Sequence, residues 1–207
     1  MAWREEAARR APRRFRGEVY WSRPLPAFGN PRSRLLVVGL APAAHGGNRT
    51  GRIFTGDESG NFLFCALHAV GLSNQPDSIR PGDGLELSGT LLTAAVKCAP
   101  PDNRPLPEEF DNCREYLVRE AALIGSPRVV VALGGLAFDS CLLTLAAIGA
   151  PILRPRPRFA HGARYAVGRD VLYASYHPSQ QNTFTGRLTQ RMLRAVLRRA
   201  AREAQSS

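Results

Sequence analysis

The stretch Arg34–Leu40, RLLVVGL, is an apolar run interrupted only by Gly39 after its opening arginine. Such a run is typical of a parallel strand whose two faces are both covered by helices. Three further segments have a similar character: Leu91–Val96, Val129–Leu133 and Val171–Tyr176. Tyr165–Val167 and Val171–Tyr176 indicate a short antiparallel return around Gly168. Helical patterns separate the four strands along the chain. The sequence therefore predicts an α/β fold of three layers, with a central, mainly parallel sheet of four strands between helices.

Four helices are expected between and after the strands. Ser59 is a candidate N-cap for a helix that ends before Gly71, and Pro107 marks the start of a second helix. Apolar spacing predicts a third helix over Ala137–Ala147 and a last one over about Arg187–Glu203, the latter with a dense arginine face. The loops between these elements carry the irregular, glycine- and proline-rich sequence.

The composition indicates one globular domain over residues 1–207, with 44% hydrophobic and 22% charged residues. This excludes a disordered tail, a collagen-like fibre and a coiled-coil rod. Four cysteines are too few for a disulfide scaffold of this length. The first residues lack the apolar segment of a signal peptide, and the apolar stretch Val129–Leu153 is better explained as strand, turn and helix than as a membrane span. We expect a cytoplasmic monomer that is not associated with a membrane.

The charge balance points to a polyanionic partner. Lysine and arginine number 28 against 17 acidic residues, which leaves a formal net charge of +11. Such an excess favours nucleic acid over acidic proteins or neutral metabolites.

Three irregular segments each follow a predicted strand: Ala41–Asp57, Cys98–Pro107 and His177–Gly186. Sites in open α/β sheets lie at the carboxyl ends of the strands, so these segments should meet over one crevice. The sequence has no Walker lysine motif, no GxGxxG opening a helix and no GxSxG elbow. These absences argue against phosphate-loop, dinucleotide-dependent and serine-hydrolase chemistry.

The same segments contain long strings that resemble a known family. GLAPAAHGGNRTGRIFTGDESG (39–60), AAVKCAPPDNRPLPEE (94–109) and HPSQQNTFTGRLT (177–189) resemble the motifs of the uracil-DNA glycosylase superfamily, in particular family 5, the B-type enzymes of bacteria and archaea. The resemblance implies hydrolysis of the N-glycosidic bond of uracil, and of other deaminated bases, in double-stranded DNA. This reaction starts base excision repair, and the resemblance also implies a bacterial or archaeal protein associated with the nucleoid.

The resemblance also implies roles for residues around the flipped base. Phe54 would stack on uracil, although a buried phenylalanine of the core is the plain alternative. His177 would donate a hydrogen bond to uracil O2 as negative charge builds on the leaving base. Asn103 would recognise the Watson–Crick edge, or it is a turn residue ahead of Arg104 and Pro105. Further base-binding positions are Ala41, Ala43 and Asn48.

The position that places the attacking water differs between this chain and most of the superfamily. Most members of the superfamily carry an acidic or amide residue where this chain has Leu40 and Ala41, and family 5 shares that difference. Asp57 is the nearest carboxylate of the same loop, and we expect it to steer the water or stabilise the cationic sugar. The alternative is that Asp57 caps the following helix near Ser59.

The last loop is expected to contact DNA. Gln181 stands where related enzymes insert a leucine into the duplex, and Asn182 follows it. Arg187, Arg191 and Arg194 are candidates for phosphate contacts, with a solvated helix face as the alternative.

Cys98 and Cys113 correspond to two of the four cysteines that bind a 4Fe–4S cluster in this family. The other two form a C-x-x-C pair that precedes the family segment matching Trp3, and this sequence has no such pair. We therefore expect a longer native product that begins upstream with a C-x-x-C segment, and the alternative is that the cluster has been lost.

Two other function classes remain open from the sequence. One is a relative that binds damaged DNA but does not hydrolyse it, which the residues Leu40 and Ala41 keep possible. The other is a nucleotide-binding α/β enzyme unrelated to DNA, which the charge and the missing phosphate motifs disfavour. The sequence does not rank uracil against hypoxanthine or xanthine.

Overall fold

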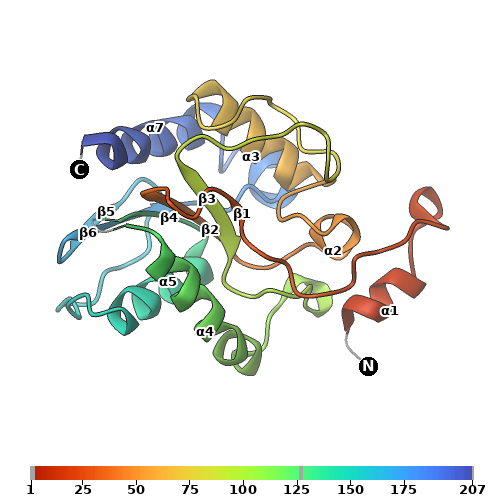
Figure 1. Ribbon diagram of the computed structural model, residues 1–207, viewed down its shortest axis with the longest axis horizontal. Helices are drawn as coiled ribbons and strands as arrows, with labels where there is room; N and C mark the ends of the chain where they lie inside the picture. The colour runs from red at the N-terminus through yellow and green to blue at the C-terminus, as the bar shows by residue number, and fades with distance from the viewer. Residues whose placement is uncertain (1–2, 126–127, 207) are drawn as a thin grey trace.

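A six-stranded sheet forms the centre of the computed structural model, which describes residues 3–125 and 128–206 (Figure 1). Its spatial order is β1-β3-β2-β4-β6-β5. The strands are β1 (Phe28–Gly29), β2 (Leu35–Gly39), β3 (Thr90–Ala94), β4 (Val129–Leu133), β5 (Arg164–Val167) and β6 (Asp170–Ser175).

The four predicted strands form the parallel centre of this sheet. β2 pairs in parallel with β3 and with β4, and β4 pairs in parallel with β6. The prediction of four strands was incomplete, because β1 and β5 add antiparallel edges to β3 and β6. β1 is only two residues long, and β5 is exposed at alternate positions, so neither gives the continuous apolar signal of the central strands.

Helices cover both faces, as the three-layer prediction requires. α3 and α7 lie on one side of the sheet and α4 and α5 on the other, while α1 and α2 lie beside it (Figure 1). None of the described helices is long and apolar enough to cross a membrane. The helices are α1 (Trp3–Arg9), α2 (Gly47–Thr50), α3 (Glu58–Ala69), α4 (Pro107–Leu123), α5 (Gly135–Ala147), α6 (Gln180–Phe184) and α7 (Gln190–Ser206), with 3-10 turns at η1 (Arg13–Phe15) and η2 (Pro101–Asn103).

Two expectations about local structure are corrected. Asp57, not Ser59, is the N-cap of α3, because the Asp57 Oδ1 accepts a hydrogen bond from the Gly60 amide at 2.8 Å. The loops after β2 and β6 are not irregular throughout, since they contain the short helices α2 and α6.

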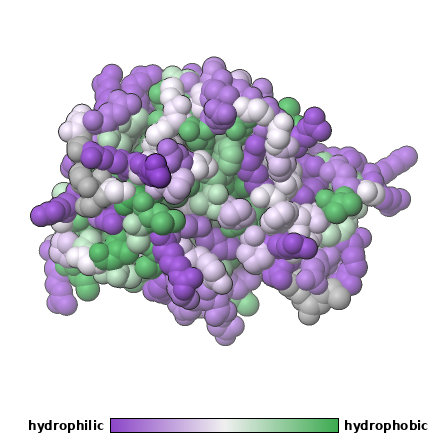
Figure 2. Space-filling model, viewed as in Figure 1, coloured by the Kyte–Doolittle hydropathy of each residue, from purple (hydrophilic) through white to green (hydrophobic). Residues whose placement is uncertain are grey.

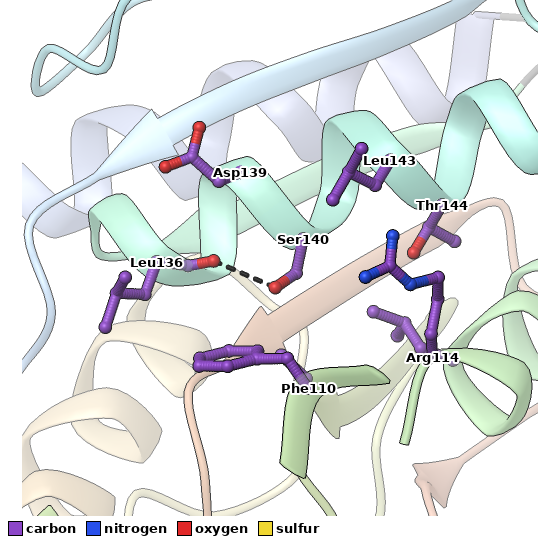
Figure 3. Close-up of a pocket in the computed structure, with 9 residues that line it drawn as sticks. Phe110, Arg114, Leu136, Asp139, Ser140, Leu143 and Thr144 are labelled. Carbon is purple, nitrogen blue, oxygen red and sulfur yellow. Dashed lines mark hydrogen bonds between the residues drawn. The ribbon is translucent and has the colours of Figure 1, made fainter. Parts of the chain in front are cut away.

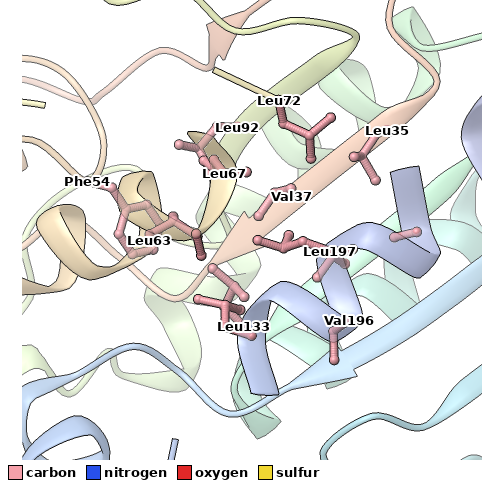
Figure 4. Close-up of a cluster of buried hydrophobic side chains, with 14 of the residues drawn as sticks. Leu35, Val37, Phe54, Leu63, Leu67, Leu72, Leu92, Leu133, Val196 and Leu197 are labelled. Atoms are coloured by element: carbon pink, nitrogen blue, oxygen red, sulfur yellow. The ribbon is translucent and has the colours of Figure 1, made fainter. Parts of the chain in front are cut away.

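The hydrophobic core forms two layers that alternate along each central strand. In β2, Leu35 and Val37 face α3 and α7, while Leu36 and Val38 face α4 and α5. Figure 4 shows the first layer, with Phe54 beside Leu63 at one end of it. Strands that are buried on both faces place their carboxyl ends rigidly, and the candidate site is built there.

Candidate active site

The carboxyl ends of the central strands lie level with one another. Gly39 of β2 pairs with Ala94 of β3, and Leu133 of β4 pairs with Ser175 of β6. The loop after β2 and the loop after β6 meet above these ends. Their contact is between the rings of Phe54 and His177, whose centroids are 5.9 Å apart with an interplanar angle of 32°. The predicted meeting of these two loops is therefore confirmed.

Phe54 is held tightly at the end of β2. A Cβ atom added to Gly39 would lie 2.7 Å from the Phe54 ring, and one added to Gly60 would overlap the Phe54 carbonyl oxygen. Phe54 adopts a left-handed backbone conformation, with φ of 51°, and its side chain is only 6% exposed. It belongs to the hydrophobic core, as the alternative interpretation has it, and its stacking on a base stays a prediction.

The two carboxylate oxygens of Asp57 have different surroundings. Its Oδ1 caps α3, while its Oδ2 lies so close to Gly46 that a Cβ atom there would overlap it. Burial raises the pKa of Asp57, and the hydrogen bonds from the Gly60 and Ser59 amides act in the opposite direction. A carboxylate with a raised pKa is a better proton acceptor than an ordinary aspartate.

Arg49 fixes the loop that carries Phe54 and Asp57. Its Nε donates to the His45 carbonyl at 2.8 Å, and its Nη2 donates to the Gly56 carbonyl at 3.3 Å. Its Nη1 forms an ion pair with Glu18 at 2.7 Å, and its guanidinium carbon lies 4.1 Å from the centroid of the Phe15 ring. Arg49 thus joins the N-terminal segment to the loop after β2.

His177 is half-buried and lies two residues after the end of β6, next to Tyr176. Desolvation lowers the pKa of His177 to about 4, so the imidazole is neutral at pH 7. The Asn182 amide donates to the His177 carbonyl at 2.8 Å and closes the loop. The side chain of Asn182, predicted to contact DNA, is thus engaged with the main chain of His177.

The pocket residues predicted from the first motif differ in their surroundings. Ala41 and Ala43 are half-buried in the loop after β2. Asn48 is fully buried, and its Nδ2 donates to the Arg4 carbonyl at 3.0 Å and to the Ala44 carbonyl at 3.3 Å. With no exposed surface, Asn48 holds α1 in place and does not support a direct contact with a base in this conformation.

Asn103 ends the turn η2, where Asp102 and Asn103 both have left-handed backbone conformations. The side chain is exposed. This geometry agrees with the turn interpretation, and its contact with a base stays a prediction.

The residues predicted to contact DNA in and after the last loop fall into two groups. Gln181, Arg187 and Arg191 are exposed, and the Arg187 guanidinium lies over the Tyr176 ring at 4.6 Å. Arg194 is half-buried and donates to Cys65 Sγ at 3.4 Å, so the expectation of a free phosphate-binding arginine there is not supported.

The donor set at Cys98 and Cys113 does not complete a four-thiolate site. Cys98 Sγ accepts from Arg4 Nη1 at 3.3 Å, and Cys113 Sγ accepts from the Lys97 amide at 3.4 Å. Burial raises the pKa of Cys98, which favours the protonated thiol. In the part of the chain that the structure describes, no three His, Cys, Asp or Glu residues are grouped to hold a metal ion. We therefore assign no step of the reaction to an iron–sulfur cluster.

A separate cavity of about 160 Å³ lies between α4 and α5 (Figure 3). Phe110 and Arg114 of α4 face Leu136, Leu143 and Thr144 of α5 across it. None of the residues predicted to bind the base lines this cavity, so it is distinct from the site at the strand ends.

Gly39 is a site residue that the sequence analysis did not single out. Glycine inside a buried strand weakens the strand and often marks a close approach of another group. Here that group is the Phe54 ring. The glycine within RLLVVGL was the available signal.

Comparison with known proteins agrees with this geometry. The family model described as the uracil DNA glycosylase superfamily matches residues 26–201. The chain is 52% identical to a type-5 uracil-DNA glycosylase of Thermus thermophilus, over 99% of this chain and 90% of that one. It is 48% identical to the type-5 enzyme of Mycobacterium bovis, over 99% and 75% of the two chains. It is also 31% identical to a type-4 uracil-DNA glycosylase of Pyrobaculum aerophilum, over 77% and 74%.

Proposed function

The chain belongs to the uracil-DNA glycosylase superfamily, and from that premise we propose that it excises uracil from double-stranded DNA by hydrolysing the N-glycosidic bond. The observation that carries the proposal is the contact between Phe54 and His177 at the carboxyl ends of β2 and β6. An aromatic ring and a neutral imidazole, brought together from distant segments, match what a flipped base needs: a stacking surface and a hydrogen-bond donor.

His177 suits the departure of the base. As the bond between the sugar C1′ and uracil N1 breaks, both electrons go to uracil and negative charge collects on its O2. A neutral imidazole N–H can donate to that oxygen, and the low pKa of His177, about 4, keeps the ring neutral at pH 7. The hydrogen bond strengthens as charge develops, so it stabilises the transition state more than the bound substrate.

Asp57 suits the arrival of water. The water oxygen bonds to C1′ and loses a proton, which leaves an abasic sugar. The Asp57 Oδ1 is engaged with the Gly60 amide, and Oδ2 lies against Gly46, in the space that a side chain there would fill. We assign to Asp57 the role of accepting the proton or stabilising the positive charge on the sugar.

The chemistry of the single lysine supports a monofunctional enzyme. Glycosylases that also cut the strand need an amine to form a Schiff base with the sugar. Lys97, the one lysine of the sequence, is 4% exposed, and its Nζ is bound to Glu120 at 2.6 Å, Thr93 at 2.7 Å and the Ala94 carbonyl at 2.9 Å. An ammonium group held in this way is not free to attack the abasic sugar.

The surface supports binding to a phosphate backbone. Figure 2 shows hydrophilic side chains over α7 and along the N-terminal segment. Exposed arginines lie in both places, including Arg191 and Arg199 on α7 and Arg13, Arg14 and Arg16 near η1. Together with the net charge of +11, these arginines favour a duplex as the partner.

The proposal is tested by incubating the chain with a duplex that contains one uracil and treating the product with alkali. A glycosylase gives strand cleavage only after alkali. A relative that only binds damaged DNA shifts the duplex in a gel without producing alkali-sensitive sites. A nucleotide-binding enzyme unrelated to DNA neither shifts the duplex nor produces alkali-sensitive sites. Either of these last two results would reject the proposal.

A further inference from the structure

His161 lies beside the end of β6, although it belongs to the segment before β5 and no motif includes it. Its Nδ1 is 3.2 Å from the Tyr176 amide nitrogen and 3.5 Å from Ser175 Oγ. Its ring stacks on the Tyr176 ring, with centroids 5.0 Å apart and an interplanar angle of 20°. The residue that follows Tyr176 is His177.

These contacts define the hydrogen-bonding state of His161. The Tyr176 N–H is a donor, so Nδ1 must be the acceptor, and the proton of the neutral ring is on Nε2. Burial lowers the pKa of His161, which favours this neutral state. A protonated ring would direct a second donor at the Tyr176 amide and lose the hydrogen bond.

The peptide groups around His177 are thereby held on two sides. On the preceding residue, the Tyr176 amide donates to His161 Nδ1. On the following side, the His177 carbonyl accepts from the Asn182 amide at 2.8 Å. The Tyr176 ring also packs between two neighbours. The centroid of the Phe159 ring is 6.0 Å from that of Tyr176, and the Arg187 guanidinium lies over the Tyr176 ring.

We propose that His161 is a positioning residue for His177, which it orients by accepting the Tyr176 N–H through Nδ1. The proposal rests on the proposed function, because it takes His177 as the donor to the leaving base. Catalytic hydrogen bonds depend on sub-ångström placement, so a loosened Tyr176–His177 peptide should slow the chemical step more than it weakens binding.

The test compares two variants of nearly equal shape. His161→Asn places an oxygen at the position of Nδ1 and can still accept the Tyr176 N–H, whereas His161→Leu cannot. Both lose the stacked ring, so their difference isolates the hydrogen bond. His161→Phe, which keeps a ring and lacks the acceptor, serves if the leucine variant does not fold. The control is His68→Asn, on the exposed surface of α3.

The first readout is the single-turnover rate on uracil duplex, with duplex affinity measured alongside. We expect His161→Leu to lose about tenfold or more in rate with affinity nearly unchanged, and His161→Asn to keep most of the rate. Equal rates for the two variants, or a full rate for His161→Leu, would overturn the proposal.

The second readout does not depend on activity. Amide hydrogen exchange at Tyr176 should be slow in the wild type and in His161→Asn and fast in His161→Leu. Exchange that is equally slow in all three would also overturn the proposal. A wild-type chain that releases no uracil would reject the proposed function instead, and exchange at Tyr176 would still decide whether His161 holds this peptide.

Discussion

Replacing Gly39 by alanine tests whether the position of Phe54 matters for catalysis. The new Cβ atom would lie 2.7 Å from two atoms of the Phe54 ring, and ordinary contacts begin at 3.4 Å. The ring must therefore move by about 0.7 Å, because Gly39 lies in the central strand β2 and cannot retreat. Displacements on the order of 1 Å at a catalytic site cost about 10²-fold in rate. We expect Gly39→Ala to lower the single-turnover rate by about ten- to a hundredfold.

The measurement is rapid-quench excision of uracil from a duplex, with urea denaturation of the same protein. Gly125→Ala is the matched control, since a Cβ atom there meets nothing within 4 Å. The alanine at position 39 adds strain of about 1–3 kcal/mol, typical of overpacking, so the folded fraction must be measured with the rate. A folded Gly39→Ala protein with the full wild-type rate would refute the view that the site depends on this ring.

Substitutions of His177, Asp57 and Arg187 probe other parts of the site. His177→Ala should slow excision about 10²–10³-fold with the affinity for abasic DNA nearly intact. The wild-type rate should show no titration of His177 between about pH 5.5 and 8, because the pKa of this imidazole is lowered to about 4. Asp57→Asn should slow excision but keep the cap of α3 and the stability of the protein. Asp57→Ala should slow excision and also lose about 1 kcal/mol of stability. A full rate in the asparagine variant would show that Asp57 acts only as a helix cap. Arg187→Gln should flatten the dependence of log affinity on log salt by about one, while Arg202→Gln, at the far end of α7, should not, and an unchanged slope would return Arg187 to the solvated surface.

The central strands could be predicted because parallel strands are buried on both faces. RLLVVGL has no polar face, and neither does Val129–Leu133, which forms β4 over the predicted residues. Of the edge strands, β5 was predicted as a short antiparallel return around Gly168, whereas β1, two residues long, gave no such signal. For the cap of α3 the sequence offered both Ser59 and Asp57, which are good capping residues, and the hydrogen bond from the Gly60 amide identifies Asp57 as the cap.

The site was predictable to the level of loops and less so for single side chains. The strand-end rule brings the loops of Phe54 and His177 together, and the structure agrees. The rule does not show which polar residues turn inward. Asn48 is bound to the carbonyl of Arg4, 44 residues away, and Arg194 is bound to Cys65, 129 residues away. Such long-range contacts leave no local signal, so both residues were expected to face a ligand.

The most direct test of the proposed function is to measure free uracil and abasic sites in the same reaction on a duplex with a single uracil opposite guanine. We expect one uracil released for each abasic site formed, an intact strand until alkali is added, and no release from the matched duplex with thymine. The His177→Ala protein, at the same concentration, should bind the duplex and release uracil far more slowly. Binding by the wild-type protein with no uracil released would contradict the proposal that this chain is a uracil-DNA glycosylase.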